Sequence, residues 1–262
     1  MIFQKLHQWK DYSVIKTLDQ LFLKINSLIV ISKIFYKGKV YNSLDLSGLD
    51  TSNVKNMESM FESYYMNLIN ITDLDTSSVT NMNKLFLNCD SLKSLYISNF
   101  NILNEETMEY MFNNCSNIEF LDLSSFDTPK LVLAQGMFKG CESVTSIDFG
   151  HFDGSFIKNM KGFFSMCYNL KNIDLSNIKV DKIEYMNEMF YKCTSLKYLN
   201  LLKFNTKNVK DFSKIFYGCY NLEFIEINNF DTSSAIGNSF EKMFYNHGKL
   251  KNCQNCQNNI NK

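Results

Sequence analysis

The stretch that decides the fold is Asp75–Leu95, which reads DTSSVTNMNKLFLNCDSLKSL. Its last residues begin an alternation of apolar and polar side chains that Tyr96 and Ile97 continue. A two-residue period of this kind is typical of a half-buried strand. The same frame returns along the chain about every 26 residues, so the sequence is an internal repeat and has to be interpreted as one.

Eight apolar-polar-apolar triplets mark the centres of the predicted strands. Their first spacing is 25 residues and the other six spacings are 26, so the register hardly drifts. One strand and one turn cannot bury their apolar faces alone, but copies stacked at a strand spacing of about 4.8 Å can. The triplets are centred on Asp45, Asn70, Tyr96, Asp122, Asp148, Asp174, Asn200 and Glu226.

A second pattern follows each strand. Met82, Leu85, Phe86 and Cys89 stand at i, i+3, i+4 and i+7, which is the spacing of one face of a helix. In seven of the eight repeats the corner between the two patterns carries Asp or Asn, whose side chain can bond a backbone amide two residues on. The sequence therefore predicts an α/β solenoid of about eight repeats, with a parallel β-sheet on the concave face and short helices on the convex face.

The repeat resembles a known family. The segments LDLSGLDTSNVKNMESMF at Leu44–Phe61 and DTSSVTNMNKLFLNCDSLKSL at Asp75–Leu95 are similar to leucine-rich repeats. More narrowly, they resemble the BspA-like leucine-rich repeats and the 26-residue repeat of bacterial surface proteins, from about Leu44 to Asn252. The resemblance implies a cell-surface or extracellular protein that binds other proteins and does not catalyse a reaction.

The ends of the chain differ from the repeats. Residues 1–43 contain an amphipathic stretch that predicts an N-terminal helical cap, residues 44–252 form the predicted leucine-rich-repeat solenoid, and residues 253–262 form a predicted mobile tail. Cys253 and Cys256 in that tail form a C-x-x-C pair. Such a pair is half of a zinc site, so a metal clip and a tail without function are both open interpretations.

Composition limits the classes of partner and the location. The chain has 27 lysines, no arginine and 27 acidic residues, so no global positive field exists to attract nucleic acid. No apolar run is long enough for a signal peptide or a membrane span, so we expect no membrane insertion. The resemblance points to the cell surface, and a cytoplasmic location is the alternative.

Six cysteines recur once per repeat, from Cys89 to Cys219. Stacking spreads them along a line, whereas a metal or redox site needs ligands that converge on one point. We therefore predict a column of small buried thiols that stay unreactive until the protein unfolds. Neighbouring thiols are predicted not to form disulfides.

The outward residues of the strands form the candidate site. Neighbouring Asp residues about 5 Å apart repel each other by about 0.8 kcal/mol in water, a cost that a positive partner would offset. Exposed aromatic residues beside the acids have the composition of a binding hot spot. The alternative is that these Asp residues serve solubility and local hydrogen bonds with the following Ser. The predicted partner-binding residues are Asp45, Asn70, Tyr96, Phe120, Asp122, Asp148, Asp174, Tyr198, Asn200, Phe224 and Glu226.

No motif for catalysis is present in the sequence. The three histidines, His7, His151 and His247, have no partner in a recognised nucleophile or zinc motif, and there is no Gly-rich phosphate loop. We expect a monomer without cofactor or metal that binds a basic or amphipathic protein partner. An intracellular scaffold or a regulatory ligand-binding repeat protein is the alternative function.

Overall fold

The structure, a computed structural model, describes residues 43–46, 50–63, 67–176, 178–246 and 250. The cap predicted for residues 1–43 lies outside the described residues except for Ser43. The predicted tail at residues 253–262, with Cys253 and Cys256, lies wholly outside them. Both predictions therefore stay predictions.

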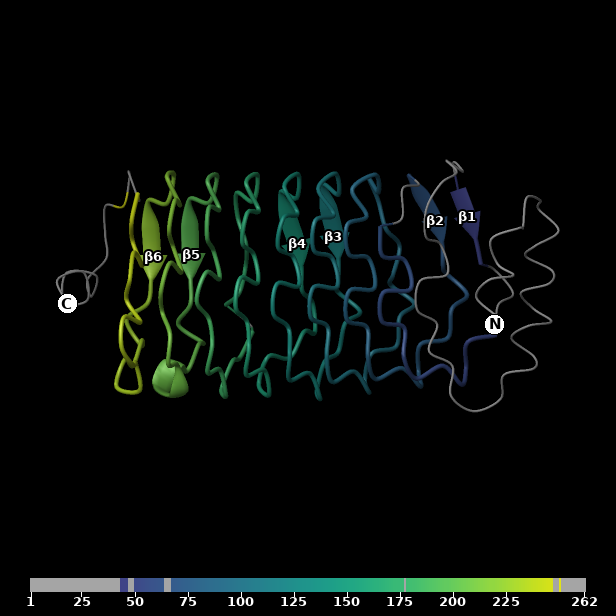
Figure 1. Ribbon diagram of the computed structural model, residues 1–262, viewed down its shortest axis with the longest axis horizontal. Helices are drawn as coiled ribbons and strands as arrows, with labels where there is room; N and C mark the ends of the chain where they lie inside the picture. The colour runs from purple at the N-terminus through teal and green to yellow at the C-terminus, as the bar shows by residue number, and fades with distance from the viewer. Residues whose placement is uncertain (1–42, 47–49, 64–66, 177, 247–249, 251–262) are drawn as a thin grey trace.

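The described chain forms a stack of similar coils along one axis, with the strands of successive repeats side by side (Figure 1). Each strand is three residues long, and the strands pair in parallel as three two-stranded sheets. The register joins Leu44 to Ile69, a shift of 25 residues, and Leu121 to Ile147, a shift of 26. The repeat period read from the sequence is thus confirmed as the spacing between coils. The strands are β1 (Ser43–Asp45), β2 (Leu68–Asn70), β3 (Phe120–Asp122), β4 (Ser146–Asp148), β5 (Tyr198–Asn200) and β6 (Phe224–Glu226).

The predicted parallel sheet is confirmed only in part, as separate parallel strand pairs. The triplets at residues 95–97 and 173–175 form no strand, so the described strands do not join into one sheet. A different column joins the coils, through single parallel bridges at the start of the second pattern of each repeat. Because this column already connects successive coils, the strand column does not have to be continuous. The bridged residues are Asn56, Asn81, Thr107, Leu133, Asn159, Tyr185 and Asp211.

The predicted convex helices are wrong for the described residues, which contain no α-helix. Lys84 has a φ of 57° and Asn88 a φ of 59°, whereas an α-helix needs negative φ at every residue. The backbone instead alternates its hydrogen-bond partners. The amides of Met82, Lys84 and Phe86 donate to the next coil, whereas Leu85 donates to the Met82 carbonyl three residues before it. The described residues contain one helical element, the 3₁₀ helix η2 (Thr206–Asn208).

The predicted core positions are nevertheless buried. Met82, Leu85, Phe86 and Cys89 are each 0% exposed, as are their counterparts in most repeats. The phenylalanine rings of successive coils stack on one another, with centroids 5.7 Å apart for Phe86 and Phe112. Stacked rings at this distance contribute beyond the burial of their area. The core is therefore one continuous column that runs the length of the stack.

The corners close as predicted, with one exception. The Asp75 carboxylate accepts a hydrogen bond from the Ser77 amide at 2.9 Å, and Asp153 and Asp231 accept the equivalent bond. Asp127 has no such amide to accept from, because residue 129 is proline, which lacks the N–H group. In four repeats the threonine after the corner Asp or Asn bonds the neighbouring coil, as Thr76 Oγ1 does to the Asn101 carbonyl at 2.8 Å.

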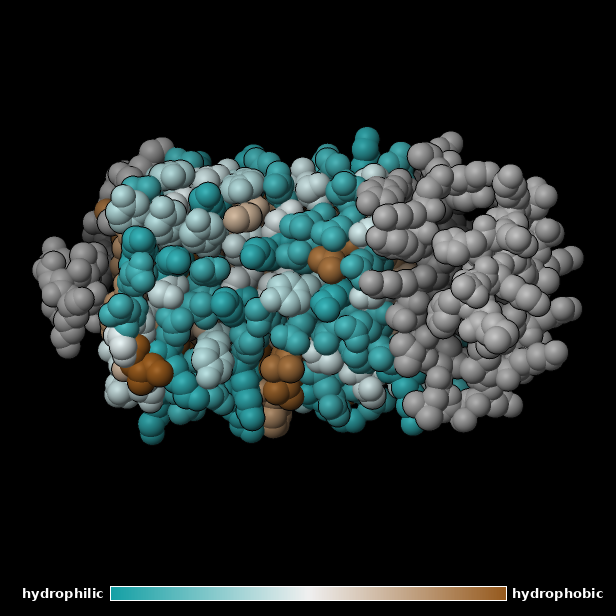
Figure 2. Space-filling model, in the orientation of Figure 1, coloured by the Kyte–Doolittle hydropathy of each residue, from teal (hydrophilic) through white to brown (hydrophobic). Residues whose placement is uncertain are grey.

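The face shown in Figure 2 is mostly hydrophilic, with small separate hydrophobic patches between the grey ends. In the part of the chain that the structure describes, no helix has the length and apolar character needed to cross a membrane.

Candidate functional site

Apart from Asp45, the predicted binding residues project from one side of the strand column, which we call the strand face. It consists of the middle residue of each triplet and the residue before each triplet. The aromatic residues of this face are well exposed, at 69% for Tyr96, 52% for Phe120, 44% for Tyr198 and 42% for Phe224. Large apolar side chains outside this face, such as Phe156 at 45% and Tyr220 at 46%, are exposed to a similar degree, so what marks the strand face is that four such rings lie on one surface.

The polar members of the strand face alternate with buried core residues. In β3 and β4 the first and third residues are exposed and the middle one is buried. Asp122 lies opposite Asp148, and Asp45 lies opposite Asn70. The exposed polar members are Asn70, Asp122, Asp148 and Asp174, and the half-buried ones are Asn200 and Glu226.

The register also brings aromatic residues together. Tyr198 and Phe224 are direct partners in the pair β5–β6, one strand spacing apart. Tyr96 and Phe120 belong to neighbouring repeats at the other side of the acidic residues. The strand face therefore carries aromatic residues at both ends of a strip of carboxylates, which we call the two aromatic pairs. Only Tyr198 and Phe224 are register partners, because Tyr96 lies in the column of the carboxylates and Phe120 in the column before it.

The acids of this face make local hydrogen bonds. Asp122 Oδ1 accepts from the Ser124 amide at 2.9 Å, and Asp148 Oδ1 accepts from the Gly150 amide at 3.0 Å. Asp174 accepts from both the amide and the hydroxyl of Ser176, at 2.9 and 2.6 Å. The serine side-chain bonds, and then the amide bonds, lower the pKa of Asp122 and of Asp174. The local role that the sequence left open is thus confirmed, and the binding role stays a prediction.

These acids form no ion pair with another described residue. None of the ion pairs found among the described residues involves Asp122, Asp148 or Asp174. Since the three carboxylates are charged and follow one another along the stack, they repel one another. The strip is therefore a row of carboxylates that a cation can approach.

Tyr198 is tied to the next coil. Burial raises the pKa of Tyr198, and the hydrogen bond with Glu226 raises it further, because the proton is held between the phenol oxygen and the carboxylate. The side chain of Asn200 opposes this shift in part.

The cysteine column is placed as predicted. The six thiols are free and buried, and Cys89 Sγ donates to the Phe61 carbonyl at 3.0 Å. The other five make the same bond at 3.1 Å, each to the phenylalanine of the preceding coil. Burial raises the pKa of Cys141 and of Cys219 to about 12. A thiol in this state is a structural group and a poor nucleophile, so the buried-thiol prediction is confirmed.

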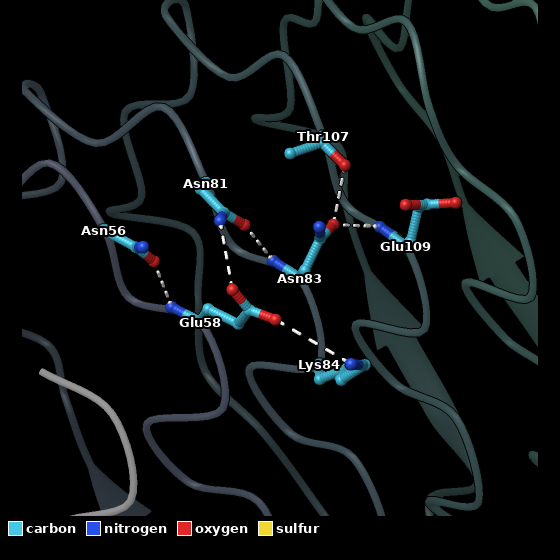
Figure 3. Close-up of polar contacts among 7 residues, drawn as sticks. All are labelled: Asn56, Glu58, Asn81, Asn83, Lys84, Thr107 and Glu109. Atoms are coloured by element: carbon cyan, nitrogen blue, oxygen red, sulfur yellow. Dashed lines mark hydrogen bonds and ion pairs between the residues drawn. The ribbon is translucent and has the colours of Figure 1, made fainter. Parts of the chain in front are cut away.

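Sequence reasoning missed a polar network on the bridge column (Figure 3). The Asn83 side-chain oxygen accepts a hydrogen bond from Thr107 Oγ1 at 2.7 Å in the next coil. Glu58 accepts from Asn81 Nδ2 at 3.4 Å and pairs with Lys84 at 3.7 Å. These contacts join three successive coils, so the network stabilises the stack. The recurrence of Asn before Met in several repeats was the available signal.

The sequence analysis also missed Glu105. Its side chain is fully buried, and neither carboxylate oxygen has a hydrogen-bond partner. Comparison of the repeats could have found it, because the equivalent position elsewhere is aliphatic. We call those residues the aliphatic column: Val54, Val79, Leu131, Ile157, Ile183 and Val209.

Comparison with known proteins bears on the whole chain. No curated protein and no solved structure matches it. One family matches three overlapping segments, residues 2–65, 63–167 and 134–258, as expected if the chain is built from repeats of one kind. The chain therefore belongs to the family described as "Mycoplasma protein of unknown function, DUF285".

Proposed function

We propose that this protein is a non-catalytic interaction module that binds a partner protein through the strand face. We further propose that it is a leucine-rich-repeat solenoid of about eight repeats, related to the BspA-like surface proteins. The observation that supports binding is the set of four exposed aromatic side chains in outward strand positions, Tyr96, Phe120, Tyr198 and Phe224.

The energy available from these rings supports the proposal. An aromatic side chain buries about 150 to 250 Å² when fully covered, and the four rings are roughly half exposed. Covering the remaining area at about 25 cal/mol per Å² would contribute on the order of 2 kcal/mol for each ring. Four such contributions total about 8 kcal/mol, which lies within the range of about 4 to 15 kcal/mol that association costs, so the rings supply a large part of the energy that a specific contact needs.

The charge of the face adds selectivity. Asp122, Asp148 and Asp174 are exposed and make only local bonds to the following residues. A basic or amphipathic partner gains from these charges, and an acidic partner is repelled. A protein partner of that chemistry is therefore the one we propose.

The location follows from the proposed relationship. BspA-like proteins act at the cell surface or outside the cell, and we propose the same address here. One observation favours the alternative of an intracellular scaffold: the six described cysteines are free thiols, which is the usual state in a reducing compartment. Protease treatment of intact cells separates the two, because a surface protein is digested and an internal one is not.

An affinity pull-down with the full chain tests the binding function. The variant Phe120→Ser/Phe224→Ser removes one ring from each aromatic pair, and we expect it to lose most of the captured partner. Phe156→Ser is the matched control, because Phe156 is 45% exposed and lies outside the strand face. Equal capture by the wild type and the strand-face variant would refute the proposal, provided that both give the same circular dichroism spectrum.

A further inference from the structure

We infer that the strand face accepts an extended basic segment of the partner, which runs along the stack and carries an apolar anchor at each end. This inference rests on the proposed function and specifies the chemistry of its partner. It is argued from the spacing of the aromatic pairs, from the carboxylates between them and from the distribution of charge along the chain.

The two aromatic pairs set the distance between the anchors. Tyr96 and Phe120 come from one pair of neighbouring repeats, and Tyr198 and Phe224 come from another pair four repeats later. At about 4.8 Å for each repeat, the centres of the two pairs lie roughly 19 Å apart along the stack. An extended chain rises about 3.3 Å per residue, so the two anchors of the partner lie about six residues apart.

The carboxylates fill the interval between the pairs. Asp122, Asp148 and Asp174 occupy three successive repeats, and the residues that precede their triplets in β4 and in the next repeat are Ser146 and Asn172, which are shorter than the aromatic side chains. The middle of the strip is therefore lower and negatively charged, and its two ends are higher and apolar. A segment with lysines in the middle and apolar residues at both ends is complementary to this shape and charge.

The width of the strip favours an extended segment over a helix. The acids form a single column, and the exposed Lys171 and Lys197 stand two residues before their triplets. A helix is about 10 to 12 Å wide with its side chains, so a basic helix would also meet these lysines. An extended chain presents every second side chain to the column and avoids that repulsion.

The net charge of the repeats supports attraction at longer range. The whole chain is neutral, but residues 43–246 contain 17 lysines and 25 acidic residues, a formal net charge of −8. The balancing charge lies in residues 1–42, with seven lysines and two acids, and in residues 247–262, with three lysines and no acid. The field around the stack therefore speeds the approach of a cationic segment, and salt weakens it.

A synthetic peptide tests the inference directly. The probe is the capped peptide Phe-Ser-Lys-Ser-Lys-Ser-Phe, whose two Phe residues are six positions apart, titrated into the full-length protein and followed by calorimetry. We expect binding that weakens at least threefold between 50 and 300 mM salt. We expect no binding of the peptide with Glu in place of both Lys, and weaker binding of the short peptide Phe-Lys-Lys-Phe, which cannot reach both pairs.

Two variants of the protein complete the test. Asp148→Asn keeps the hydrogen-bonding oxygen and removes the central charge, so we expect several-fold weaker binding and a smaller salt effect. Phe156→Ser should bind as the wild type does. The inference is overturned if the long and short peptides bind equally, if Asp148→Asn has no effect, or if the protein does not bind the probe because its own basic ends occupy the face.

Failure of this inference can be told apart from failure of the proposed function. If the pull-down captures a partner that depends on the strand face but the peptide does not bind, the extended basic segment is wrong and the interaction module stands. If capture does not depend on the strand face, both are wrong.

Discussion

Replacement of Glu105 by valine should stabilise this protein, and by an amount that depends on pH. Glu105 stands in the aliphatic column, where its carboxyl group is fully buried. Burial raises the pKa of Glu105 to about 8, and the neighbouring Glu106 adds to the shift. The nearby Met82 amide opposes the shift only in part, since its hydrogen is donated to the Thr107 carbonyl at 3.2 Å.

The magnitude follows from the difference between the folded and unfolded pKa. The unfolded value is 4.5 and the folded value about 8, and each unit is worth about 1.4 kcal/mol. Between these two values the folded state binds more protons than the unfolded state, so stability falls as the pH rises. At pH 7 the ionisation of this carboxyl group in the unfolded state therefore lowers the free energy of unfolding by about 3 kcal/mol. This loss stops growing above about pH 8.

Two variants separate the contributions. Glu105→Gln removes the titration and keeps a buried polar group, whereas Glu105→Val also removes the polar group and restores the aliphatic column. We expect Glu105→Gln to gain stability over the wild type by about 1.4 kcal/mol per pH unit between about pH 4.5 and 8. We expect Glu105→Val to be more stable still at every pH, by about 1 to 3 kcal/mol, because no polar group is left unpaired.

The assay is urea unfolding at pH 5, 6, 7 and 8, followed by circular dichroism. Glu119→Gln is the control, because Glu119 is exposed and does not contribute to the shifted pKa of Glu105. A stability difference between wild type and Glu105→Gln that stays constant over this range would refute the reasoning. So would a Glu105→Val protein that is less stable than the wild type at pH 7.

Further predictions concern the backbone and the thiols. Gly150 has a φ of 42°, and a Cβ placed there would lie 2.3 Å from the Ser124 carbonyl oxygen, so Gly150→Ala should cost about 3 kcal/mol and lower the Tm by roughly 5 to 10 °C. Gly237 has a similar φ of 54°, and a Cβ placed there would have no atom within 4 Å. If Gly237→Ala loses as much stability as Gly150→Ala, the clash at Gly150 is not the cause of the loss. Lys192 has a φ of 58°, so Lys192→Gly should raise stability by about 1 kcal/mol in thermal unfolding, whereas Lys158→Gly, at a position without positive φ, should lower it. The six buried cysteines should react with a thiol reagent at the rate of unfolding, and fast labelling of the native protein would show that the column is accessible.

Much of the candidate site could be predicted from the sequence. The alternation within each triplet placed Phe120 and Asp122 on the outside and Leu121 in the core, and the burial of these residues agrees. The sequence could not decide between two roles of the Asp side chains, because an Asp followed two residues later by Ser suits both a local turn and an exposed binding surface. The hydrogen bond from Ser124 to Asp122 identified the local role.

The sequence by itself determined the period, the strand positions and the set of buried residues, since burial follows from the spacing of apolar side chains. Only the tertiary structure decided the backbone of the second pattern. Met82, Leu85, Phe86 and Cys89 satisfy the spacing of a helix, yet Lys84 between them has positive φ. A helix pairs each amide within its own segment, whereas here the Phe86 amide donates to the Met111 carbonyl of the next coil, at 2.8 Å. That partner lies 25 residues further along the chain, so no local pattern can reveal it.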